Sequence, residues 1–187
     1  MMRRRFNPSL LLFVHIASVV CANPADAKVR NIRLRELIKQ SDYVLLARVS
    51  WVVRFDGLHV AMADPIDVFK GEPRLEPIYF VADSTWTCDT STAVRGETAL
   101  LFLTKAKSQR VDLIGRKPAK VKANPLYFIS HSGRGRMPLK TIDGWPCVNV
   151  QSEVLLPASV QPIPRPIRPY IPGRWVPQTD VVTYVSK

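Results

Sequence analysis

Two cysteines carry the clearest chemistry in this sequence. Cys88 and Cys147 each follow a tryptophan placed two positions before them, and a third cysteine, Cys21, lies within the first 27 residues. The spacing Cys-x-x-Cys, which is typical of a reactive thiol pair, is absent. If the chain is exported and loses Cys21, the two remaining cysteines are most simply one structural disulfide. On the chain-entropy estimate, a bridge across so long a loop contributes about 4 kcal/mol.

Histidine and serine offer a second kind of chemistry. The sequence contains neither Gly-x-Ser-x-Gly nor His-Glu-x-x-His. His131-Ser132, together with an acid such as Asp83, is the one combination that would suit a hydrolase, and a trio of this kind is found in almost any small domain. We therefore expect no catalytic residues, and we keep a small secreted hydrolase that uses His131 and Ser132 as the alternative.

Metal chemistry is not expected. His59, Asp64 and Asp67 lie near a proline break, and their spacing is not that of a known metal-binding loop. We predict neither a metal site nor a cofactor.

Positive charge is the strongest compositional feature. The chain has 27 Lys and Arg residues against 15 Asp and Glu residues, a formal net charge of +12. The excess favours anionic partners, or else simply a soluble surface. The densest group extends from residue 105 to residue 122 and comprises Lys105, Lys107, Arg110, Arg116, Lys117, Lys120 and Lys122. No aromatic residue is interleaved for base stacking, so an anionic surface is favoured over nucleic acid.

A glycine-rich segment supplies two more basic residues. Arg134 and Arg136 alternate with Gly133 and Gly135 in the sequence HSGRGR. We expect either a clamp for a phosphate or carboxylate group or a flexible connector.

The first 27 residues are typical of an export signal. Arg3-Arg4-Arg5 precede the apolar run Leu10 to Val20, and Ala25-Asp26-Ala27 places small residues before a cut at Lys28. The apolar run is shorter than the about 20 residues that span a bilayer. We therefore expect a periplasmic or secreted protein with no transmembrane segment and, after loss of three arginines and one aspartate, a net charge of +10.

The last part of the chain is rich in proline. Seven prolines lie between Pro157 and Pro177, and we predict an extended, polyproline-like tail over residues 157–187. The side chains that would contact a partner are Arg165, Arg168, Tyr170, Arg174 and Trp175. The alternatives are a strap packed along the chain's own domain or a spacer.

The residues between signal and tail, 28–156, predict one mainly β domain. An apolar stripe indicates a short helix over residues 31–39, and β-branched or alternating runs indicate strands. The predicted strands cover residues 43–54, 58–63, 66–69, 77–82, 98–104 and 126–130, followed by a hairpin over 137–142 and 148–155. The pattern is that of a small, mostly antiparallel barrel or sandwich.

Three segments in order resemble one family. The run Ser41-Asp42-Tyr43 to Val49, the segment Val68-Phe69-Lys70-Gly71, and Cys88 followed by Gly96-Glu97 and Leu100 to Leu103 are similar to bacterial relatives of the netrin-like OB barrel. The resemblance covers about Arg30 to Lys105 and implies a small OB-like barrel, which tissue inhibitors of metalloproteinases share. Those inhibitors bind zinc through an N-terminal Cys-x-Cys. Cys21 lacks the second cysteine, so we do not expect inhibition by that route.

These observations together predict an exported, non-enzymatic binding module. It would contact an anionic envelope polymer or a protein partner. Besides the hydrolase, a protein inhibitor of a secreted enzyme remains an alternative.

Overall fold

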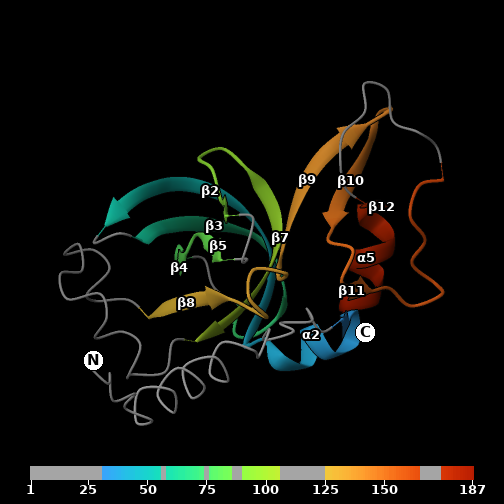
Figure 1. The fold of residues 1–187 in the computed structure, drawn as a ribbon, viewed down its shortest axis with the longest axis horizontal. Coiled ribbons are helices and arrows are strands. Elements are labelled where there is room, and N and C mark those ends of the chain that lie inside the picture. Colours follow the sequence, from blue (N-terminus) through green and yellow to red (C-terminus); the bar gives the residue numbers. More distant parts are fainter. Residues whose placement is uncertain (1–30, 56–57, 74–75, 86–89, 106–124, 165–173) are drawn as a thin grey trace, which may run out of the picture. The chain divides into compact units, whose positions relative to one another are not determined.

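Five strands close into a barrel in the computed structural model, which describes residues 31–55, 58–73, 76–85, 90–105, 125–164 and 174–187 (Figure 1). The strand order is β7-β2-β3-β4-β8, and β8 pairs back onto β7. Only β4 and β8 are parallel among these pairs. The barrel strands are β2 (Tyr43–Phe55), β3 (Leu58–Lys70), β4 (Ile78–Val81), β7 (Thr98–Lys105) and β8 (Leu126–Ile129).

Further strands continue the same sheet beyond the barrel. Next to β7 lies β9 (Arg136–Ile142), followed by β10 (Trp145–Val150) and the edge strand β12 (Arg174–Pro177). Two helices, α2 (Leu34–Gln40) and α5 (Gln178–Val185), pack with this part of the sheet. Two small pairs complete the described fold: β1 (Ile32–Arg33) with β11 (Val154–Leu155), and β5 (Asp83–Thr85) with β6 (Thr90–Thr92).

Strand β7 explains the continuous apolar run that the sequence shows at residues 99–103. Leu101 and Leu103 point into the barrel, where they join one hydrophobic cluster. Leu100 and Phe102 point to the other face and join a second cluster with α2, α5 and β10. Because a strand buried on both faces has no polar side to alternate, its sequence is apolar throughout.

The long β2–β3 hairpin is bent by irregular pairing, as its length predicts. Both strands contain 13 residues, and their register shifts at three places between Val44 and Trp51. Each extra residue increases the local twist of a strand. These irregularities let one hairpin form a large part of a closed barrel.

The prediction of an extended tail is wrong for its last part. Residues 174–177 form β12, and residues 178–185 form a helix that the sequence analysis missed. Val181 and Val185, one helical turn apart, are buried in the second cluster, so tertiary packing stabilises a helix whose β-branched residues have low helix propensity. Trp175 is buried and is not an exposed contact residue.

Several other predicted features lie outside the described residues. These are the export signal over residues 1–27 and the tail residues Arg165, Arg168 and Tyr170. Within the described residues, no helix combines the length and apolarity needed to cross a membrane.

The packing of the tail leads to a first prediction. Trp175→Ala is expected to lower the free energy of unfolding by about 3–5 kcal/mol, because it empties a buried aromatic site. Trp145→Ala is the matched control and should change it by no more than about 0.5 kcal/mol, since that side chain is exposed. Urea denaturation measures both. Equal, small effects would contradict the packing of residues 174–177 described here.

Candidate functional site

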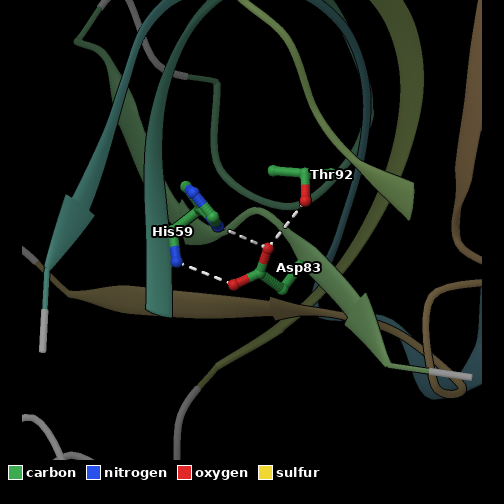
Figure 2. A network of polar contacts seen from close by, with 3 residues as sticks. All are labelled: His59, Asp83 and Thr92. Atoms are coloured by element: carbon green, nitrogen blue, oxygen red, sulfur yellow. Dashed lines mark hydrogen bonds and ion pairs between the residues drawn. The ribbon is translucent and has the colours of Figure 1, made fainter. Parts of the chain in front are cut away.

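A histidine of strand β3, an aspartate of β5 and a threonine of β6 form a polar network (Figure 2). Asp83, at the start of β5, accepts three hydrogen bonds. Its Oδ2 atom accepts from the backbone N–H of His59 at 2.7 Å, and its Oδ1 atom accepts from His59 Nδ1 and Thr92 Oγ1, both at 2.8 Å. The network therefore ties β3 to both strands of the β5–β6 hairpin.

The geometry fixes the direction of these hydrogen bonds. Since an ionised carboxylate only accepts, His59 Nδ1 donates to Asp83 Oδ1. Burial raises the pKa of Asp83, but the hydrogen bonds from the His59 backbone, Thr92 and the His59 ring outweigh it and leave that pKa below its usual value. The arrangement thus holds the imidazole of His59 in one orientation.

An oriented histidine can serve in catalysis or in metal binding when further groups lie beside it. In the part of the chain that the structure describes, no group of three His, Cys, Asp or Glu residues could hold a metal ion. The hydrolase alternative combined Asp83 with His131 and Ser132, whereas Asp83 directs both carboxylate oxygens at His59. We therefore regard the network primarily as a structural contact that holds the β5–β6 hairpin against β3.

The glycine-rich segment HSGRGR forms a tight turn in which residues 133–136 are buried. His131, Ser132 and Gly133 all have positive φ angles, between 54° and 92°. A Cβ atom on Gly135 would lie 2.6 Å from the carbonyl oxygen of Phe102, so only glycine fits there. Gly135 thus allows close packing against β7, and Gly133 supplies a positive φ angle in the turn.

Arg136 forms an ion pair with Glu97 inside the domain. This contact corrects the predicted role of Arg136 in binding an external anion. Its Nε and Nη2 atoms donate to the two carboxylate oxygens of Glu97, at 2.8 Å and 3.1 Å. Both side chains are about nine-tenths buried. This bidentate pair joins β9 to the residue before β7.

Arg134 and Arg174 are likewise turned inward. Burial lowers the pKa of both guanidinium groups, and the nearby carboxylate of Glu153 partly offsets this effect. Arg174 donates to the carbonyl oxygens of Gln151 and Val154. Arg134 was predicted to bind anions and Arg174 to contact a partner, but the structure uses both inside the domain.

The remaining basic cluster falls almost entirely outside the described residues. Lys105 is exposed at the end of β7, and its backbone N–H donates to Asp42 Oδ2 at 2.6 Å. The other predicted residues lie in the connection from β7 to β8, and their role stays a prediction: Lys107, Arg110, Arg116, Lys117, Lys120 and Lys122.

Cys147 is a buried free thiol in the structure. Its Sγ donates to the carbonyl oxygen of Trp145 at 3.4 Å, and burial, aided by Asp143, raises its pKa. Cys88 lies outside the described residues, so the Cys88–Cys147 bridge stays a prediction.

The motifs that carry the family resemblance have structural roles. Lys70 Nζ donates to three carbonyl oxygens at the end of α2, those of Ile38, Lys39 and Ser41, at 2.5–3.2 Å. Gly71 has a φ of +103°, and a Cβ atom there would lie 2.5 Å from the ring of Tyr43. This Lys-Gly pair caps a helix and leaves room for a buried ring.

Comparisons with known proteins give no match. No family model fits the chain, and neither a curated protein nor a solved structure is similar to it.

Sequence reasoning missed the polar pairs. His59 and Asp83 are separated by 24 residues, and Glu97 and Arg136 by 39. No local pattern marks such pairs, and the one available signal is an acid beside a predicted strand.

The network of His59, Asp83 and Thr92 leads to a second prediction. Asp83→Asn mimics the protonated carboxyl and should lower the free energy of unfolding by about 1–3 kcal/mol near neutral pH, because an NH2 donor replaces one of the two oxygens that accept hydrogen bonds from His59 and Thr92. Because the pKa of Asp83 is lower in the folded chain than its ordinary value of 3.8, the ionised carboxylate stabilises the fold above pH 3.8. This stabilisation is lost as the pH falls through the pKa of the folded state. Urea denaturation at neutral and acid pH should therefore show wild type and variant converging in acid. A difference independent of pH would contradict the role of the ionised carboxylate.

Proposed function

We propose that this protein is an exported, non-enzymatic binding module that contacts an anionic component through an OB-like barrel. The strand connectivity is the observation that carries the proposal. Numbered along the chain, the barrel strands pair in the order 1-2-3-5-4, with strands 3 and 5 parallel. That connectivity supports an OB-like assignment, in which ligands are held by the face of strands 2 and 3 and by the loops 1–2 and 4–5.

The fourth and fifth strands are β7 and β8, and the connection between them holds the densest basic cluster of the sequence. A ligand loop of the OB type and a run of lysine and arginine thus coincide in one segment. This coincidence favours an anionic ligand, because clustered positive charge attracts polyanions.

One further observation supports a binding role over catalysis, and another supports the family resemblance. Asp83, the acid of the hydrolase alternative, is committed to His59 and Thr92. The netrin-like motif residues Lys70 and Gly71 stabilise the barrel, which supports the resemblance at the level of fold. Export rests on the sequence of residues 1–27 alone.

Retention on an anionic polysaccharide resin tests the proposal. Replacing four basic residues of the connection by glutamine should weaken retention on the order of tenfold in affinity, since each exposed charge pair contributes about 0.2–1 kcal/mol. The residues to replace are Lys107, Lys117, Lys120 and Lys122.

A control with the same net charge separates a local contact from general attraction. Four exposed basic residues elsewhere, Arg35, Lys39, Arg48 and Arg95, should be replaced by glutamine in the same way. We expect this control to retain most of the affinity. Equal losses in both variants, or retention that salt does not affect, would overturn the proposal.

A further inference from the structure

Trp145 is the most exposed large hydrophobic side chain among the described residues, with 72% of its surface accessible. It follows the two-residue turn Asp143-Gly144 at the tip of the β9–β10 hairpin. The turn residues have φ angles of 50° and 83°, as a type I′ turn requires. The indole is therefore presented by a short, regular turn and not by a long loop.

The strands below the tip are firmly packed. Ile142, Cys147 and Trp175 form a small buried cluster beneath it, with Ile163 against them. Strand β12 pairs with β10 on its outer side, and Lys140 Nζ lies 5.9 Å from the centroid of the Trp175 ring. Trp145 is therefore exposed to solvent although Ile142 and Cys147, its nearest neighbours on the same face, are buried.

The surroundings of Trp145 are too polar and too narrow for a protein interface. Its exposed neighbours are Lys140, Thr141, Asp143, Gly144 and Pro146, and one indole supplies far less than the about 800 Å² per partner of a standard interface. The headgroup region of a bilayer accepts a single indole, because tryptophan is apolar at one end and donates a hydrogen bond at the other.

We propose that the β9–β10 tip inserts Trp145 into the headgroup region of an anionic lipid bilayer. The inference rests on the proposed function and names its partner, since the net charge, +12 for the whole chain and +10 without residues 1–27, is complementary to an anionic membrane. Asp143 is the one acid at the tip, and it opposes deep insertion, so the indole reaches the headgroup level only.

Vesicles with and without phosphatidylglycerol test the proposal directly. Trp145→Ala should lower partitioning onto the anionic vesicles about tenfold, or about 1.4 kcal/mol, because the headgroup region buries only part of the large apolar side chain. Ile66→Ala removes another exposed apolar side chain, 58% accessible on β3, and should leave partitioning unchanged. Brominated lipids should quench tryptophan fluorescence in wild type and less so in Trp145→Ala.

A second pair of variants tests the orientation. Asp143→Asn preserves the turn, since Asn-Gly suits type I′, and should strengthen binding about fivefold, because one charge near the membrane surface is worth about 1 kcal/mol. Asp67→Asn makes the same charge change at an exposed residue of β3 and should have a much smaller effect on vesicle binding.

The outcomes distinguish this inference from the proposed function. If Trp145→Ala binds anionic vesicles as wild type does, or if neutral vesicles bind equally well, the insertion is overturned. Polysaccharide retention that still depends on the β7–β8 connection would then leave the proposed function standing. Loss of vesicle binding in Trp145→Ala with unchanged polysaccharide retention supports the insertion.

Discussion

The double burial of β7 is the constraint on which the described fold depends. Its inner residues fill the barrel, and its outer residues, Leu100 and Phe102, form the floor of the second hydrophobic cluster. The same strand pairs with β2 and β8 to close the barrel and with β9 to extend the sheet. A polar residue at any of these positions would face one of two cores, so the strand can present no side to solvent.

Around this strand, polar contacts fix the elements that side-chain packing alone would leave free to shift. The hydroxyl of Ser130 lies 2.8 Å from that of Ser41 and 2.7 Å from that of Thr104, which links β8, α2 and β7. Lys70 binds at the same end of α2, where it donates to the carbonyl oxygens of Ile38 and Ser41. Because buried polar groups are costly unless paired, these bonds specify one arrangement of helix and barrel.

The sequence predicted the strands well and the polar contacts poorly, for a physical reason. Strand positions follow from local alternation and β-branched runs, and the predicted boundaries of β2 and β7 lie close to the observed ones. Trp175 is buried because its strand pairs with β10, which is distant in sequence. The prolines around Trp175 indicated an extended chain instead. Likewise, the alternation of glycine and arginine at 133–136 indicated mobility, although close contact with Phe102 was the cause.

Burial of guanidinium groups changes how the charge of the chain should be weighed. Arg134, Arg136 and Arg174 count toward the formal charge of +12, yet each is engaged with a carboxylate or with carbonyl oxygens inside the domain. Arg134 and Arg136 are buried and Arg174 is half-buried, so they add little to a local surface contact, since attraction at short range depends on charges that solvent and ligand can reach. The charge available to a partner therefore comes from lysines and arginines elsewhere on the chain, with the largest sequence cluster in the β7–β8 connection. For the proposed anionic partner, the positions of the exposed charges should therefore decide local contacts, whereas the net charge adds only a general attraction.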